Sequence, residues 1–344
     1  MGNNIFNPVQ QAALSLMQSD LRFIYTVFSR FNSIKSNYIT SFMPYISVTI
    51  EGIDNWVKCF NQSNKYQLSL PRFSEREKVY YDAIRDTIKL WETNYGSAYS
   101  ALRKEYLQSE AYYRSICKPV ARKLELYDIF GVDLANGAYC GNTILCSYYL
   151  PIFSFAATSG AYIKEMSEII GKYVAAFCAT KPYPVNKFIK FDTCDFGGLI
   201  KSPVGNTFSD KFVLFCILCQ INFVLICIDK YISIEVPAKL RFSYLLYHSL
   251  LNILPNINRK LKTAFSMNNK WDSTLLRNAM AHYKLGVALQ PSELIADDLM
   301  YGIIQKTLSC SYNDVKAGII AELKSLANQL GNYLGLSCSE INGT

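Results

Sequence analysis

The stretch FVLFCILCQINFVLICI, residues 212 to 228, decides between two classes of fold. A helix that spans a membrane needs about 20 apolar residues. This run is shorter, and it carries the amides of Gln220 and Asn222 near its centre. Such amides are costly in lipid, but neighbouring groups can satisfy them inside a protein. We therefore predict a buried central helix, with a membrane span through residues 212–228 as the minor alternative.

Helical patterns cover most of the remaining chain. Between residues 8 and 42, apolar side chains recur every three or four positions, which is typical of one buried helix face. Pro44 is expected to end that helix. Ser74 and Glu77 form a capping-box signature, which predicts that a long helix begins there and continues toward Leu107. Further helices are expected over residues 144–179, 211–232, 237–252, 256–267, 271–285, 292–309 and 312–334.

Two segments rich in glycine or proline suggest how the chain is divided. Residues 128–142 are predicted to be a loop, and residues 181–210 a loop or linker. We expect a helical N-terminal region of unknown role over residues 1–180. Residues 211–344 should form an antiparallel helical bundle, because the connections between their successive helices are short. The predicted fold class is all-α.

The composition is that of a folded protein with a modest positive charge. Half of its 344 residues are hydrophobic and 14% are aromatic, which excludes a largely disordered chain. The net charge of +8 does not by itself identify a nucleic-acid-binding protein. The 11 cysteines are an odd number without regular spacing, and no signal-peptide pattern opens the chain. We therefore expect reduced thiols and a cytoplasmic protein.

Several motifs of catalysis and cofactor binding are absent from the sequence. It contains no GxGxxG, no GxxxxGK[ST] and no GxSxG, so nucleotide-driven motors, dinucleotide enzymes and serine hydrolases lose their main support. Cys216 and Cys219 form a CxxC inside the apolar run, but no second pair lies nearby, so a zinc site is not expected. We predict that the protein uses neither a metal nor a cofactor.

Positive charge gathers around the segment LLRNAMAHYKL, residues 275 to 285, which holds one of the two histidines. Residues 259–284 contain six basic residues and one acid. Such a run is either a solvated helix face or a binding surface for an anion. If that anion is RNA, the candidates for contact with it, besides Arg277, are Arg259, Lys260, Lys262, Lys270, Trp271 and Lys284. Among them, Trp271 is the aromatic side chain best suited to stack on bases.

On a helix, Arg277, Asn278 and His282 lie on one broad polar arc. Asn278 and His282 are four residues apart, so the amide can orient the imidazole or reach a ligand beside it. Arg277 leans in from the same arc, and the small Ala281 between them leaves open space. The opposite face of the helix, which is expected to contact the core, carries Leu276, Met280 and Tyr283.

An arginine and a histidine that border one cleft suit the cleavage of a phosphodiester. Arg277 can pair with two phosphate oxygens and stabilise the charge that develops in the transition state. His282, with an ordinary pKa near 6.5, can take and return a proton at neutral pH. Because RNA carries its own nucleophile in the 2′-hydroxyl, this pair needs no metal. The expected products are a 2′,3′-cyclic phosphate and a 5′-hydroxyl.

The hexapeptide RNAMAH, residues 277–282, resembles the signature of HEPN domains: an arginine, a polar residue, and a histidine after four to six intervening positions. The resemblance covers at most residues 205–335. It implies a bundle of four or five helices in which Arg277 and His282 are catalytic and Asn278 is supportive. Many HEPN proteins are metal-independent endoribonucleases of toxins and defence systems, in which two copies of the motif meet across a dimer interface. The resemblance thus implies a homodimer that cleaves single-stranded or loop RNA, with an antitoxin or defence-system partner protein.

Two other classes of function fit the same residues. The first is a non-catalytic helical module that binds RNA, a nucleotide or a partner protein through its basic face. In that case His282 is an ordinary histidine at the edge of the core. The second is a membrane-associated protein anchored by residues 212–228. Retained binding without cleavage would distinguish the module from the nuclease.

Overall fold

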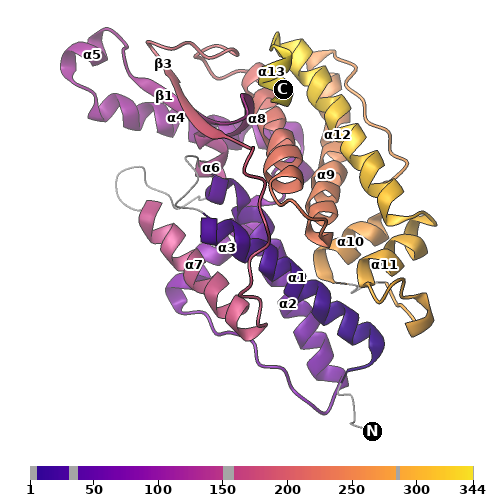
Figure 1. The fold of residues 1–344 in the computed structure, drawn as a ribbon. Helices are drawn as coiled ribbons and strands as arrows, with labels where there is room; N and C mark the ends of the chain where they lie inside the picture. The colour runs from indigo at the N-terminus through magenta and orange to yellow at the C-terminus, as the bar shows by residue number, and fades with distance from the viewer. Residues whose placement is uncertain (1–5, 31–37, 150–158, 284–286, 344) are drawn as a thin grey trace.

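The computed structural model describes residues 6–30, 38–149, 159–283 and 287–343, and it is mostly helical (Figure 1). The N-terminal part contains α1 (Pro8–Arg30), α2 (Tyr38–Ser63), α3 (Glu75–Thr87), η2 (Leu90–Glu92), α4 (Tyr95–Ile116) and α5 (Pro119–Lys123). The middle contains β1 (Asp128–Ala135), β2 (Ala138–Asn142), α6 (Thr143–Tyr149), α7 (Ser159–Ala176) and β3 (Phe191–Gly197). The C-terminal part contains α8 (Asp210–Asn222), η3 (Phe223–Lys230), α9 (Pro237–Leu261), α10 (Thr274–His282), η4 (Pro291–Glu293), α11 (Leu299–Leu308), α12 (Tyr312–Leu334) and α13 (Cys338–Asn342).

The apolar run at 212–228 forms α8 and the π-helical segment η3, and it lies inside the fold. Within the part of the chain that the structure describes, one helix, Asp210–Lys230, is long and apolar enough to cross a membrane, but 89% of its apolar window is buried within the protein. The amide of Asn222 donates to the Tyr139 carbonyl at 2.8 Å, and the Gln220 carbonyl oxygen accepts from the Trp91 indole. The predicted buried central helix is therefore confirmed, with its amides satisfied by neighbouring groups.

The predicted largely helical fold is confirmed, but a small antiparallel sheet adds to it. Residues 128–142 are the hairpin β1–β2 and not a loop, and β3 lies within the segment predicted to be a loop or linker. The strand order is β2-β1-β3, with Val132 opposite both Asn142 and Cys194. Asn136 and Gly137 form the turn with φ of 52° and 91°. An Asn-Gly pair favours such a turn, and this hairpin signal explains the strands that helical periodicity did not predict.

Several predicted helix boundaries also move. Helix α2 continues through Pro44, and α9 continues through Pro255, so neither proline ends a helix. The fully buried side chains around Pro44 indicate that tertiary packing outweighs its cost of about 3 kcal/mol. The capping box of Ser74 and Glu77 is confirmed, but its helix ends at Thr87 instead of reaching Leu107. The helix expected over residues 144–179 is described as α6 and α7, with residues 150–158 between them outside the described chain.

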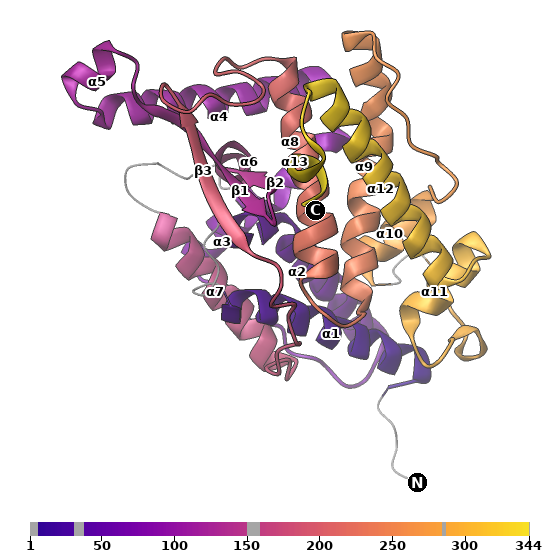
Figure 2. The ribbon, with the colours of Figure 1, turned by 45° about the horizontal axis from the view of Figure 1, so that its top comes forward.

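One hydrophobic core joins the N-terminal and C-terminal parts. Its buried side chains extend from Val9 on α1 to Ile341 on α13. Helix α1 contacts α2 and α7, and it also contacts α9 and α11 of the C-terminal part. Figures 1 and 2 show these segments, far apart in sequence, packed side by side. The C-terminal helices therefore share their core with residues 1–180.

Candidate functional site

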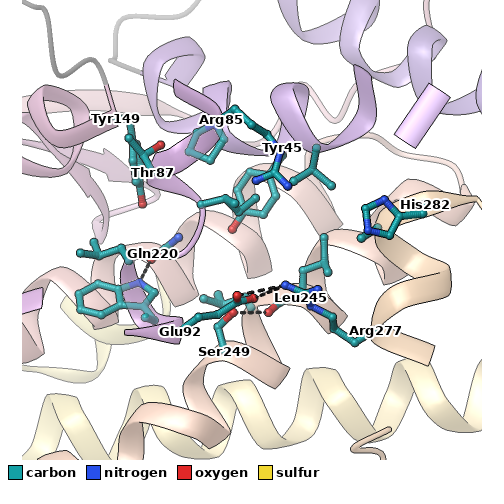
Figure 3. A pocket seen from close by; sticks show the side chains of 17 residues that line it. Tyr45, Arg85, Thr87, Glu92, Tyr149, Gln220, Leu245, Ser249, Arg277 and His282 are labelled. Atoms are coloured by element: carbon teal, nitrogen blue, oxygen red, sulfur yellow. Dashed lines mark hydrogen bonds and ion pairs between the residues drawn. The ribbon is translucent and has the colours of Figure 1, made fainter. Parts of the chain in front are cut away.

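A small pocket lies where the two parts meet, and it contains both residues of the predicted catalytic pair (Figure 3). Its walls come from α2, the end of α3 with η2, α6, α8, α9 and α10. The cavity volume is about 40 Å³. Since one water needs roughly 10–15 Å³ of such space, the pocket has room for a few waters or one small anion. The polar and charged side chains that line it are Tyr45, Arg85, Thr87, Trp91, Glu92, Tyr149, Gln220, Ser249, Arg277 and His282.

Helix α10 places Arg277 and His282 at the pocket because its opposite face is buried in the core. Ser273 caps the helix by accepting from the Leu276 amide at 3.2 Å. Leu276, Met280 and Tyr283 are buried, as the helical spacing predicts. The helix ends at His282, because Tyr283 adopts a left-handed conformation with φ of 47°. Ala281 also lines the pocket and leaves the open space that its small side chain suggests.

Arg277 is held by an acid from the N-terminal part of the chain. Its guanidinium donates to both carboxylate oxygens of Glu92, at 2.8 and 3.0 Å. Figure 3 shows the two side chains facing one another across the pocket. Arg277 Nη1 also donates to the side-chain amide oxygen Oδ1 of Asn278 at 3.3 Å. Asn278 therefore contacts Arg277, and the expectation that it orients His282 is not met in this conformation.

His282 is half-buried, and its surroundings disfavour a second proton. Burial lowers the pKa of this imidazole below its ordinary value of 6.5, Glu51 opposes that shift, and Arg277 and Arg85 add to it. Its Nδ1 atom is buried and has no hydrogen-bond partner among the described residues. The imidazole is therefore neutral at pH 7, which is the state that can accept a proton.

A second arginine, Arg85, reaches the same pocket from α3. Its Nε donates to the Glu51 carboxylate on α2 at 2.6 Å. Local sequence patterns gave no sign of this residue, because it lies almost 200 positions before His282. Two arginines and a neutral histidine thus border one cavity, and each arginine has an acidic partner.

The floor of the pocket is neutral but polar. The hydroxyls of Tyr45 and Tyr149 are buried and make no hydrogen bond of ordinary geometry among the described residues. Burial raises the pKa of both phenols, and the nearby Gln220 amide moderates the rise for Tyr45. Both hydroxyls therefore keep their protons and are available as donors. Buried polar groups without partners are uncommon, so this floor is suited to water or a small polar ligand.

The remaining RNA-binding candidates do not gather at this pocket. Arg259 and Lys260 are exposed in another groove, which Asn94 and Tyr95 also line. They lie ten or more residues past Ser249 on α9, roughly 15 Å along the helix. Lys262 is exposed and ends α9 in a left-handed conformation.

Trp271 corrects a second expectation about this surface. Its indole is buried against Gly318 of α12, and the ammonium of Lys270 lies 4.3 Å from the centre of its ring. Trp271 is therefore part of the core and does not offer a free ring for stacking on bases. Lys284 lies outside the described residues.

Among the described residues, three carboxylates lie close enough together to be considered for a metal: Glu77, Glu165 and Glu168. Glu77 already accepts from Lys172 at 2.6 Å and caps α3. Glu165 pairs with Arg76 at 2.8 Å. These contacts account for two of the three carboxylates as structural groups, so the cluster does not identify a metal site.

The face of α10 that carries the HEPN-like motif is turned toward α2 and η2 of the same chain. The resemblance implies instead that this face meets a second copy of the motif. Comparisons with protein-family models, with curated proteins and with solved structures give no match to this chain. Membership of the HEPN superfamily therefore stays a prediction, which depends on the RNAMAH hexapeptide.

Proposed function

We propose that this protein is a metal-independent endoribonuclease of the HEPN type, with Arg277 and His282 as its catalytic residues. The observation that carries the proposal is that both side chains line one pocket, together with a second arginine, Arg85. A pair of cations suits the phosphate of an RNA backbone, and a neutral histidine suits proton transfer. We further propose that the protein acts as a toxin or defence effector.

In the proposed reaction, neutral His282 takes the proton of the ribose 2′-hydroxyl. The 2′-oxygen then forms a bond to phosphorus, the bond from phosphorus to the 5′-oxygen breaks, and His282 returns the proton to that leaving oxygen. Arg277 stabilises the extra negative charge on the phosphate oxygens during the transfer. The products are a 2′,3′-cyclic phosphate and a 5′-hydroxyl.

The conformation described is a closed one for this chemistry. Both carboxylate oxygens of Glu92 accept from Nη2 of Arg277, one of the nitrogens with which Arg277 would grip a phosphate, and 40 Å³ is too small for a nucleotide. We propose that the substrate displaces the carboxylate of Glu92 when η2 moves away from α10. A homodimer in which two such motifs meet would require the same opening.

Incubation of the purified chain with end-labelled single-stranded RNA in EDTA tests the proposal. Cleavage that leaves cyclic phosphate ends is expected, and His282→Gln or Arg277→Lys should reduce its rate by about 100-fold or more. Matched controls are His248→Gln and Arg103→Lys, which change the other histidine and an exposed arginine on α4, outside the pocket. Equal loss with the controls, or no cleavage by the unaltered chain, would contradict a nuclease.

A second candidate function is a non-catalytic module that binds a phosphate-sized anion in this pocket. The small volume and the donor hydroxyls of Tyr45 and Tyr149 favour it. It predicts intact RNA in the same assay. It also predicts that inorganic phosphate raises the melting temperature of the protein, and that Tyr45→Phe with Tyr149→Phe removes this effect.

A further inference from the structure

A projecting end of the molecule exposes an unusual number of large aliphatic side chains. We define the tip as residues 114–126 together with residues 198–201. Among the described residues, six apolar side chains of the tip are between 38% and 74% exposed. Monomeric soluble proteins rarely expose contiguous apolar patches of this kind, which commonly mark an interaction site. The six are Ile116, Val120, Leu124, Leu126, Leu199 and Ile200.

The two segments of the tip form one surface. The Gly198 amide donates to the Tyr127 carbonyl at 3.0 Å, and the Gly197 amide donates to the Ile200 carbonyl at 2.8 Å. The backbone at Gly198 lies so close to Glu125 that a Cβ atom there would clash with the Glu125 carbonyl. Figures 1 and 2 both show α5 at the far end of an arm that extends away from the helices of the core. The tip therefore projects from the rest of the molecule.

The tip holds its shape through its own hydrogen bonds. The Arg122 guanidinium donates to the carbonyls of Ser115 and Cys117, each at 3.1 Å, where α4 ends. The Leu126 amide donates to the Ala121 carbonyl at 2.8 Å. None of the residues of α5 is buried. The aliphatic side chains of the tip thus face solvent from an ordered turn. Packing within the chain does not explain why these positions are apolar.

The same segments that carry these aliphatic side chains also carry an excess of positive charge. The tip contains one acid, Glu125, and its basic residues outnumber it. The nearest acids in the chain outside the tip are Glu110 on α4, four positions before Arg114, and Asp128 and Asp195 on the paired strands β1 and β3. The basic residues of the tip, all of them exposed, are Arg114, Lys118, Arg122, Lys123 and Lys201.

We propose that the tip docks on an anionic lipid surface, into which its aliphatic side chains insert. Exposed aliphatic groups interspersed with lysine and arginine match the two layers of such a surface, an apolar interior below negatively charged headgroups. RNA would satisfy the cations but leave the aliphatic side chains in water. A protein partner would need a concave and acidic surface to cover this projecting tip. The complementary charge and shape therefore favour lipid.

This inference is independent of the proposed ribonuclease. It uses none of the residues of the pocket, and a peripheral contact of this kind needs no membrane-spanning helix. The buried helix α8 takes no part in it. Failure of the lipid experiment would leave the RNA cleavage proposal unchanged, and failure of RNA cleavage would leave this one unchanged.

Sedimentation of the purified full chain with vesicles tests the proposal. The protein should sediment with vesicles of phosphatidylcholine that contain about one quarter phosphatidylserine, and should stay in solution with phosphatidylcholine alone. Val120→Asp combined with Leu199→Asp should weaken the binding by about tenfold or more. Val79→Asp is the matched control, because Val79 is a similarly exposed valine on α3, outside the tip.

A second measurement reports insertion directly. The three native tryptophans are buried, so Val120→Trp adds one exposed indole whose fluorescence can be followed. Its emission should shift to the blue with the anionic vesicles and not with neutral ones. The proposal is overturned if binding ignores lipid charge, if Val79→Asp weakens it as much as the tip variants do, or if the Val120→Trp emission does not shift. It is also overturned if the unaltered chain is a dimer that the tip substitutions dissociate while vesicles fail to bind.

Discussion

At the scale of single residues, the charge state of the pocket is set by partners that lie far away in the sequence. Arg277 and Glu92 are 185 positions apart, yet both side chains are about three-quarters buried and share two hydrogen bonds. Such a charge-assisted and mostly buried pair is stronger than an ordinary surface ion pair, because water is partly excluded. Separation of Arg277 from Glu92, which phosphate binding would require, therefore costs free energy.

Glu92→Gln is expected to raise the RNA cleavage rate severalfold. The substitution keeps the size of the side chain but removes the charge that holds Arg277, so a phosphate can compete for the guanidinium. Initial rates on single-stranded RNA measure the effect, and Glu75→Gln, at an exposed acid on α3, is the control. A lower rate in the Glu92→Gln variant would indicate that Glu92 assists catalysis and does not restrain it.

The lowered pKa of His282 predicts how stability depends on pH. In the unfolded chain this histidine binds a proton near pH 6.5, whereas burial lowers its pKa in the folded protein. As the pH falls below about 6.5, the unfolded state gains the proton first, so the free energy of unfolding decreases. Urea denaturation of the unaltered protein and of His282→Gln between pH 7.5 and 5 measures this. The difference between the two should shrink or change sign toward low pH, and a constant difference would contradict the assigned shift.

At the scale of elements, close helix contacts fix the position of the segment that leads into α10. Gly318 on α12 lies against the indole of Trp271, and a Cβ atom at Gly318 would overlap the ring. By contrast, Gly171 on α7 has no neighbouring atom within 4 Å of an added Cβ. The two glycines therefore separate the effect of packing from that of helix propensity.

Gly318→Ala is expected to destabilise the protein by about 1–3 kcal/mol, because the methyl group forces Trp271 or α12 to move. Gly171→Ala should instead stabilise it by up to about 1 kcal/mol, since alanine favours a helix and the space is open. Chemical denaturation of both variants gives the two values. If Gly318→Ala were as stable as the unaltered protein, the contact between α12 and Trp271 would not be as close as described.

At the scale of the whole molecule, a buried ion pair ties the first helix to the candidate site. Arg241 on α9 donates to Asp20 on α1, and both side chains are fully buried. Arg241 also donates to the hydroxyl of Tyr283, the residue after His282, and its Nε donates to the Met280 carbonyl at 2.5 Å. The N-terminal part thereby helps to position the end of α10.

Asp20→Leu is expected to lower the free energy of unfolding by about 3–5 kcal/mol, because it leaves the Arg241 charge buried without its partner. Adding Arg241→Met should restore much of the loss, since two apolar side chains remove the unpaired charge. Denaturation of the single and double variants measures both effects. Glu168→Ala, in an exposed pair on α7, is the control and should cost less than about 0.5 kcal/mol. A single transition is expected for the unaltered chain, because one core spans both parts.

The sequence by itself determined the features that depend on local spacing and local chemistry. Helical periodicity predicted the largely helical fold, the buried run at 212–228 and the core face of α10. The cap at Ser74 was predicted from two residues three positions apart. Helical periodicity did not predict the β1–β2 hairpin, although the Asn136-Gly137 pair is a hairpin signal. The RNAMAH hexapeptide identified Arg277 and His282 as candidates before their surroundings were known.

Only the tertiary structure decided what surrounds those candidates. It brought Glu92 to Arg277, Arg85 and Glu51 to the pocket, and Trp271 into the core against Gly318. It also carried α2 and α9 through their prolines, because burial of neighbouring side chains outweighed a local preference. Contacts between residues a hundred or more positions apart arise from the packing of whole helices. The local spacing of residues therefore does not predict these contacts. It does predict a buried helix face, because apolar residues recur there every three or four positions.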